Sequence, residues 1–326
     1  MPKASPHTPL LKVEELKTWF PIHKGILNRT AGYVKAVDGV SFHVDKGETL
    51  GLVGESGCGK TTLGRTLIGL EKYKEGAIHF NGEPLQISKG DKSWRKRMQM
   101  IFQDPFASLN PRMTVMDILT EGLVEHKLLN GSSREEAARA LMQEVRMDPD
   151  AIYRYPHEFS GGQRQRISVA RAISMKPEFI VCDEAVSALD VSVQAQVIHL
   201  LMDLREKFGL SYLFISHDLA VVRHISHRTA VMYLGMIVEI GPTKDVVSNP
   251  LHPYTQALVS AAPRPGKVKK QRIVLQGDPP SPANPPKGCR FHTRCPHVMD
   301  ICRTEEPPVV VQGPNTIKCH LYQGPA

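Results

Sequence analysis

The chain has 326 residues, of which 41% are hydrophobic and 23% charged, and 41 Lys and Arg against 33 Asp and Glu give a formal charge of +8. These proportions are typical of globular proteins and exclude wholesale disorder and collagen-like repeats. No apolar run approaches the about 20 residues of a membrane-spanning helix, and the first residues lack the apolar stretch of a secretion signal. We therefore expect a protein of the cytoplasm.

Up to about residue 240, short apolar runs alternate with longer helical patterns. The runs at 49–53, 99–102, 179–182 and 212–215 each precede polar residues or glycine, as buried strands do. Residues 113–148 predict a helical stretch of low regularity. Residues 190–208 predict a helix that Asp190 caps and Gly209 ends, because its apolar side chains recur every three or four positions. Strands separated by helices indicate an α/β fold with a largely parallel sheet.

The run that follows the first strand fits the pattern G-x-x-x-x-G-K-[ST] of a phosphate-binding loop. Glycines would let backbone amides turn towards phosphate oxygens, while a lysine and a hydroxyl would serve the β/γ-phosphates and Mg²⁺. The helical pattern after it adds a helix N-terminus, which favours an anion. We predict that nucleotide is bound by Gly54, Glu55, Ser56, Gly57, Cys58, Gly59, Lys60, Thr61 and Thr62, with Thr61 also ligating Mg²⁺.

A serine and two glycines open another predicted helix. Ser160 can cap it, and the free amides of Gly161, Gly162 and Gln163 would face an anion. A well-capped helix without a ligand would have the same residues, so this motif indicates anion binding only in combination with the other motifs.

An acidic pair ends the strand at 179–182. Asp183 could serve Mg²⁺, and Glu184 could accept a proton from the water that attacks a phosphate. Two solvated carboxylates at a strand end would look the same in isolation, but the phosphate-binding loop upstream favours the catalytic interpretation.

The composition changes near residue 242. Fifteen of the 25 prolines lie between Pro242 and Pro325. Proline removes a backbone donor, so this tail cannot consist of long helices or central strands. We expect a compact domain over 1–262, a stiff Pro-rich linker over 263–286 and a cysteine-containing extension over 287–326.

The extension contains four of the six cysteines. Disulfides are disfavoured, since cytosolic thiols stay reduced. Structural zinc takes four thiolates or imidazoles, although usually from pairs spaced more closely, and four thiolates also hold 4Fe–4S clusters. Spacing alone leaves zinc, an iron–sulfur cluster and free thiols open for Cys289, Cys295, Cys302 and Cys319. The other two, Cys58 and Cys182, fit small buried residues.

The three motifs, in this order, resemble the nucleotide-binding subunits of ATP-binding cassette (ABC) transporters over about residues 11–262. The resemblance implies an ABC-type core of the P-loop NTPases, with a parallel sheet, an antiparallel β subdomain and a helical subdomain at about 104–178. Residues 159–163 match the family's signature motif, and Ala185 stands where the family has proline. The resemblance also implies roles for Phe20 against adenine, for Gln103 as catalytic residue and Mg²⁺ ligand, for Asp190 at the nucleotide and for His217 as a catalytic switch.

Such subunits face each other head to tail, so that the phosphate-binding loop of one and the signature motif of the other enclose each ATP. The resemblance therefore implies an ATPase that uses ATP and Mg²⁺ at the cytoplasmic face of the cell membrane. Its implied partners are two transmembrane permease subunits, contacted around Gln103 and residues 105–160, and an extracytoplasmic substrate-binding protein. We expect no nucleic-acid partner, because the Lys and Arg residues do not interleave with an aromatic platform.

The run 252–258, His-Pro-Tyr-Thr-Gln-Ala-Leu, and the Pro-rich stretch after it narrow the resemblance to the oligopeptide, dipeptide and nickel importers. The F-type subunits of dipeptide importers are the most similar. They imply uptake of di- or oligopeptides, a heterodimer with a D-type subunit, and a 4Fe–4S cluster on the four tail cysteines, with Zn²⁺ as the alternative. Uptake of nickel, glutathione or oligosaccharides stays open, as does a soluble ABC ATPase outside transport, which the single cassette without heptads disfavours.

Overall fold

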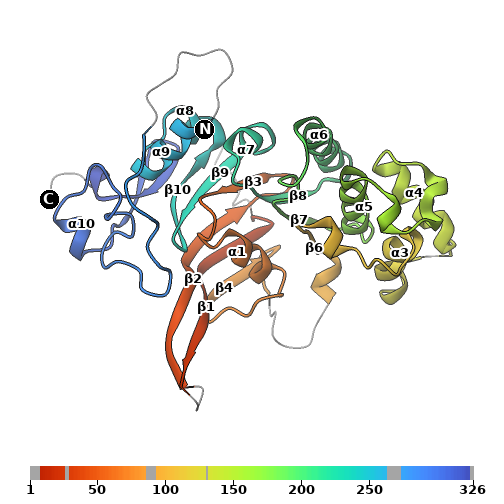
Figure 1. Ribbon diagram of the computed structural model, residues 1–326, viewed down its shortest axis with the longest axis horizontal. Helices are drawn as coiled ribbons and strands as arrows, with labels where there is room; N and C mark the ends of the chain where they lie inside the picture. Colours follow the sequence, from red (N-terminus) through yellow and green to blue (C-terminus); the bar gives the residue numbers. More distant parts are fainter. Residues whose placement is uncertain (1–7, 26–28, 86–92, 130, 263–272, 324–326) are drawn as a thin grey trace. The chain divides into compact units, whose positions relative to one another are not determined.

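The computed structural model describes residues 8–25, 29–85, 93–129, 131–262 and 273–323 (Figure 1). The chain divides into two compact units. The described residues of the first unit fall within 1–45, 49–85 and 216–326, and those of the second within 46–48 and 86–215. The expected linker over 263–286 lies partly outside the described residues.

The first unit contains two sets of strands. One set is antiparallel, in the order β2-β1-β4-β5, and the other has the order β11-β12-β10-β9-β3, in which β3 and β9 are parallel. In chain order the strands are β1 (Leu11–Lys24), β2 (Arg29–Val44), β3 (Thr49–Val53), β4 (Glu75–Phe80), β5 (Glu83–Pro84), β9 (Arg228–Tyr233), β10 (Met236–Pro242), β11 (Val309–Gln312) and β12 (Asn315–Lys318). The helices are α1 (Lys60–Leu67), α7 (Leu219–Ile225), α8 (Thr243–Ser248), α9 (Pro253–Ala261), α10 (Ile301–Thr304) and the 3₁₀ turn η4 (His320–Tyr322).

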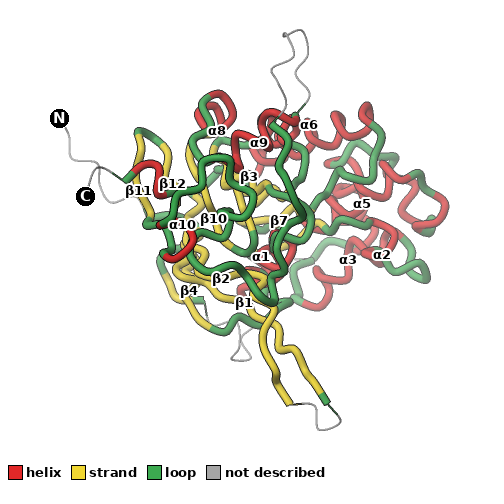
Figure 2. Tube along the Cα trace, turned by 60° about the vertical axis from the view of Figure 1, so that its left-hand side comes forward, coloured by secondary structure: helices red, strands yellow, loops and turns green. Residues whose placement is uncertain are grey.

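Strands β1 and β2 form a long antiparallel ribbon, visible as paired strands in Figure 2. Their pairing runs from Leu11 opposite Val44 to Lys24 opposite Arg29. Apolar side chains on one face of the ribbon, Val13 and Val40 among them, are almost fully buried. This ribbon and β4 confirm the expected antiparallel β subdomain.

The second unit combines a parallel sheet of order β8-β7-β6 with a group of helices. Helix α5 packs on β6 and also contacts α2, α3, α4 and α6. The strands are β6 (Met98–Ile101), β7 (Phe179–Asp183) and β8 (Ser211–Ile215). The helices are α2 (Pro105–Ser108), α3 (Val115–Glu125), α4 (Arg134–Glu144), α5 (Gly161–Ile173) and α6 (Val191–Phe208), with 3₁₀ turns η1 (Ser93–Lys96), η2 (Pro149–Tyr153) and η3 (Pro156–Glu158).

The structure confirms the four predicted strands, at 49–53, 98–101, 179–183 and 211–215. Strands β3, β7 and β8 are buried at every position, as continuous apolar runs in parallel sheets are. Helix α6 begins and ends as predicted: the Asp190 carboxylate accepts the Val193 amide at 3.0 Å, and Gly209 has a left-handed φ of 65°. Residues 113–148 are irregular because they contain two helices, α3 and α4, each with its own side-chain cap.

The described part of the tail contributes two short strands at one end of the sheet and no long helix, as its proline content predicted; β11 is the edge strand and β12 lies between it and β10. β12 adds to β10 with Glu239 opposite Ile317, and β11 adds to β12. Among the described residues, no helix is both long and apolar enough to cross a bilayer.

Two buried titratable side chains connect β10, α9 and the tail. The carboxylate of Glu239, wholly buried, accepts the amides of Leu251 and His252 and the side-chain amide of Asn315. His252 is 1% exposed, and its Nδ1 accepts the Tyr254 amide at 3.1 Å, which caps α9. Burial lowers the pKa of His252 to about 3, so the folded protein keeps this ring neutral.

His252 should make the protein less stable in acid. The unfolded chain binds a proton near pH 6.5 and the folded chain does not, so this residue's contribution to the free energy of unfolding falls as the pH drops below about 6.5. Between pH 7 and pH 5 the loss should be about 2 kcal/mol. His252→Asn retains a capping oxygen without a titrating ring, and urea unfolding at both pH values should show a dependence weaker by that amount. An unchanged pH dependence would contradict the buried neutral imidazole.

Candidate nucleotide-binding site

The phosphate loop (residues 54–62) runs from the end of β3 into the first turn of α1 in the first unit. Two of its positions must be glycine because other backbone segments lie very close to them. Gly54 has φ 158° and Gly59 has φ 109°. A Cβ on Gly54 would lie 2.2 Å from the carbonyl oxygen of Met232, and one on Gly59 would lie 2.0 Å from that of Ala36. Both contacts are with backbone, which cannot move aside, so only glycine permits this loop.

The loop turns its lysine inward. Lys60 is 4% exposed, and its Nζ donates to the carbonyls of Gly54 at 2.8 Å and Glu55 at 3.0 Å. A phosphate oxygen is a stronger acceptor than these neutral carbonyls, so nucleotide can draw the ammonium away from them. Helix α1 begins at Lys60 after Gly59, which has no side chain to cap it, so the first-turn amides suit an anion.

The cysteine of the loop is a buried core residue, as predicted. Cys58 is 6% exposed, and burial raises the pKa of its thiol although Lys60 acts in the opposite direction. Burial also raises the pKa of Cys182 in β7. Both thiols therefore stay protonated and unreactive.

The two other predicted residues of the first unit lie at its surface. Phe20 in β1 is 36% exposed, so its ring has an accessible face for stacking. The preceding Trp19 instead donates to Asp38 at 3.0 Å and is fixed in place. His217 is exposed in the turn before α7.

In the second unit, the structure brings together Gln103 and Glu184. Gln103 Nε2 donates to Glu184 Oε2 at 3.0 Å. Glu184 follows β7 with a left-handed φ of 46°, and the neighbouring Asp183 is 2% exposed. A left-handed backbone is uncommon for a glutamate. The predicted general base and the predicted catalytic glutamine are therefore direct neighbours.

The turn after Glu184 forms with alanine in place of proline. Ala185 is 2% exposed, and both the amide and the hydroxyl of Ser187 donate to the Glu184 carbonyl at 3.0 Å. Two hydrogen bonds thus hold the turn without the conformational restriction of a proline.

The signature motif (residues 159–163) begins α5 with a capping box. Ser160 Oγ accepts the Gln163 amide at 3.4 Å, and Gln163 Oε1 accepts the Ser160 amide at 2.9 Å. Both side chains line an open cleft of about 460 Å³ together with Arg146, Arg154 and Arg166. Three guanidinium groups and a helix N-terminus outweigh the one carboxylate in the lining, that of Asp148, and make this cleft attractive to an anion.

Gly162 allows α5 to approach α6 closely. A Cβ at this position would lie 2.4 Å from Cγ1 of Val193. Gly162→Ala should therefore destabilise the protein by about 1–3 kcal/mol through overpacking, although alanine suits a helix better than glycine. In a Val193→Ala background the same substitution should cost little, as thermal unfolding of the four proteins would show. An equal cost in both backgrounds would mean that Val193 is not the obstacle.

Sequence reasoning missed that the tail contacts the phosphate loop. Arg294 Nη1 donates to Glu55 Oε2 at 2.7 Å and its Nη2 donates to Oε1 at 3.2 Å, although 239 residues separate the partners. The hydroxyl of Tyr254 in α9 accepts the Glu55 amide at 2.8 Å. Nothing in the spacing of the sequence indicates either contact.

The four tail cysteines lie near one another, but the predicted 4Fe–4S cluster is not supported. Burial raises the pKa of Cys289 and of Cys319 to about 11 each, and the neighbouring tail thiols add to both shifts. The Cys289 amide also donates to the Cys302 carbonyl at 2.9 Å. Within the described ranges, however, no three His, Cys, Asp or Glu side chains are grouped closely enough to hold a metal ion. The thiols are suitable ligands for iron or zinc, but their arrangement does not fit a metal ion.

The chain matches two protein families and several curated relatives. Residues 37–187 match the family described as ABC transporter, and residues 238–302 match the C-terminal region of oligopeptide/dipeptide transporters. The chain is 55% identical over 320 residues to the oligopeptide transport ATP-binding protein AppF of Bacillus subtilis, covering 96% of this chain and 97% of AppF. It is 50% identical over 316 residues to the probable peptide ABC transporter ATP-binding protein y4tS of Sinorhizobium fredii, covering 96% of this chain and 90% of that protein.

Solved structures support the same fold. CbiO1 from Clostridium perfringens, part of the ABC transporter complex CbiONQ, superposes with a TM-score of 0.63 at 25% identity over 74% of this chain and 92% of its own. The ATP-binding cassette MJ0796, solved as a dimer bound to ADP and Pi, gives a TM-score of 0.62 at 22% identity over 72% of this chain and 98% of its own, which concerns the fold alone.

Proposed function

Because this chain belongs to the family of ATP-binding subunits of oligopeptide and dipeptide ABC transporters, we propose that it hydrolyses ATP to power the uptake of short peptides. The hydrogen bond between Gln103 and Glu184 carries the proposal, because it joins the candidate base to the candidate Mg²⁺ ligand. Peptide as cargo is supported by the names of the relatives and by the tail, which resembles the C-terminal region of oligopeptide/dipeptide transporters.

The phosphate loop binds the triphosphate. Its glycines expose backbone amides, and Lys60 exchanges two neutral carbonyls for the oxygens of the β/γ-phosphates. The residues that would hold Mg²⁺ are the Thr61 hydroxyl, the buried carboxylate of Asp183 and the amide oxygen of Gln103. When bound, the ion would neutralise the charge that develops on the phosphate oxygens.

Glu184 accepts the proton of the attacking water. The hydrogen bond from Gln103 to Oε2 orients the carboxylate, and the turn held by Ser187 holds its backbone at the end of β7. We infer that His217 is the switch that responds to the γ-phosphate and that Phe20 is the stacking surface for adenine.

A second subunit completes the site. The cleft at the signature motif combines Ser160, a helix N-terminus and three arginines, which suits the γ-phosphate of an ATP held by a partner's phosphate loop. We infer pairing with a non-identical D-type subunit, with the pair held peripherally on the cytoplasmic face of the membrane by two permease subunits. An extracytoplasmic binding protein would deliver the peptide to the permeases.

Two substitutions test the ATPase assignment. Lys60→Ala should abolish ATP binding, since the loop loses its cation. Glu184→Gln should leave ATP binding intact and lower kcat by about 10²–10⁴-fold, the usual contribution of a general base. ATP binding and phosphate release should be measured with the permeases present.

The matched control is Glu178→Gln, the same chemical change at a half-buried carboxylate that pairs with Arg97 at 2.6 Å. It should leave kcat unchanged. Equal turnover by Glu184→Gln and wild type would remove Glu184 from the role of base.

A cofactor in the tail is a separate proposal. We propose a four-thiolate centre on the tail cysteines, a 4Fe–4S cluster with Zn²⁺ as the alternative, because the four residues lie near one another. Against it stands the finding that, among the described residues, their side chains are not grouped closely enough to hold a metal ion. Protein purified without oxygen should then be brown and contain about four irons with matching sulfide per chain, and Cys295→Ser should lower both contents. Stoichiometric zinc would exclude the cluster, and thiols that titrate freely with no bound metal would exclude both.

A further inference from the structure

The tail segment 289–295 contacts the phosphate loop through a paired ion contact. The guanidinium of Arg294 is 7% exposed and meets both carboxylate oxygens of Glu55, which is 29% exposed. A two-point contact between planar groups fixes orientation as well as distance, and shielding from water strengthens it. Arg294 therefore determines where the Glu55 side chain lies.

Glu55 is also held through its backbone. Its amide donates to the Tyr254 hydroxyl at 2.8 Å, and its carbonyl accepts from Lys60 Nζ at 3.0 Å. The tail supports Tyr254 through Phe291, which is 1% exposed and lies 5.5 Å from the Tyr254 ring, centroid to centroid. One residue of the phosphate loop thus connects the tail to the catalytic lysine.

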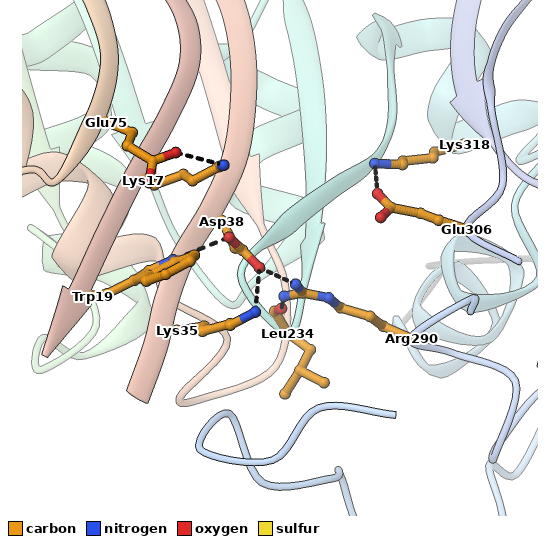
Figure 3. Close-up of polar contacts among 9 residues, drawn as sticks. All are labelled: Lys17, Trp19, Lys35, Asp38, Glu75, Leu234, Arg290, Glu306 and Lys318. Carbon is orange, nitrogen blue, oxygen red and sulfur yellow. Dashed lines mark hydrogen bonds and ion pairs between the residues drawn. The ribbon is translucent and has the colours of Figure 1, made fainter. Parts of the chain in front are cut away.

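Arg290 provides a second route from the tail to the loop. It donates to the Leu234 carbonyl at 2.6 Å and pairs with Asp38, as Figure 3 shows. Gly235, the residue after Leu234, donates its amide to the Cys58 carbonyl at 2.9 Å. Arg290 is 13% exposed and Asp38 is 10% exposed, so this contact is partly shielded from water.

We propose that Arg294 and Arg290 are positioning residues that hold the phosphate loop in its nucleotide-binding shape, so that the tail sets the affinity for ATP. This inference rests on the proposed function, because it assumes that the loop binds ATP. Loss of Arg294 frees the Glu55 carboxylate and so loosens the backbone of the phosphate loop, whose amides must keep their positions to meet phosphate oxygens. The reacting residues Gln103 and Glu184 are untouched, so the effect falls on binding and not on the chemical step.

The test measures ATP affinity and turnover of the full chain with its permeases. Arg294→Ala should raise Kd and KM for ATP about 10-fold while kcat at saturating ATP stays within about two-fold of wild type. Arg294→Lys, which retains the charge but not the two-point contact, should give an intermediate Kd. Arg290→Ala should also raise Kd.

Glu55→Gln keeps the size of the side chain and removes its charge, so it weakens the same contact from the other side. If Arg294→Ala does not fold, Glu55→Gln is measured in its place, and its Kd for ATP should also rise. The double variant Arg294→Ala, Glu55→Gln should bind ATP no more weakly than Arg294→Ala alone, since both changes break one contact.

The matched control is Lys318→Ala, which removes another ion pair of the tail, with Glu306 (Figure 3). It should leave Kd for ATP unchanged. A wild-type Kd in Arg294→Ala, or an equal rise in Lys318→Ala, would overturn the positioning role. Failure of the proposed function itself would be distinguishable, because wild type would then bind no ATP.

Discussion

Close packing of backbone against backbone at the phosphate loop is the constraint on which the rest of the site depends. The carbonyl oxygens of Met232 and Ala36 come so near to Gly54 and Gly59 that no side chain fits between them. These carbonyls belong to β9 and β2, so the curvature of the loop depends on strands that are distant in sequence. This curvature turns Lys60 inward, and it leaves no tolerance for substitution at the two glycines.

The acidic pair in the second unit is positioned by an uncommon backbone conformation and by hydrogen bonds, and not by close packing. Glu184 has a left-handed backbone although it is not glycine, and the turn after it is held by Ser187. Such a conformation persists only where the surroundings determine it. The buried strand before Glu184 and the bond from Gln103 provide those surroundings, so the carboxylate is oriented before any substrate arrives.

Structural features that depend on a few neighbouring residues could be predicted from the sequence, whereas contacts between distant segments could not. Periodicity identified β3, β7, β8 and α6, and cap chemistry placed Asp190 and Gly209, since each of these signals lies within a few residues of its effect. The motif around Lys60 identified the loop for the same reason. Arg294 carries no such signal, because an arginine in a Pro-rich tail is normally a solvated side chain. The number of tail cysteines indicated a metal, but whether one binds depends on how their side chains are arranged, which local sequence does not determine.

The contact between Glu55 and Arg294 also determines when, during synthesis of the chain, the phosphate loop is complete. Glu55 leaves the ribosome 239 residues before its partner, a delay of about 12–48 s at the usual speed of translation. A nascent chain can build strands β1 to β10 and its signature helix during that time, yet the loop that would bind ATP still lacks both arginines. Full affinity for the nucleotide is thus reached only when synthesis of the chain is nearly finished.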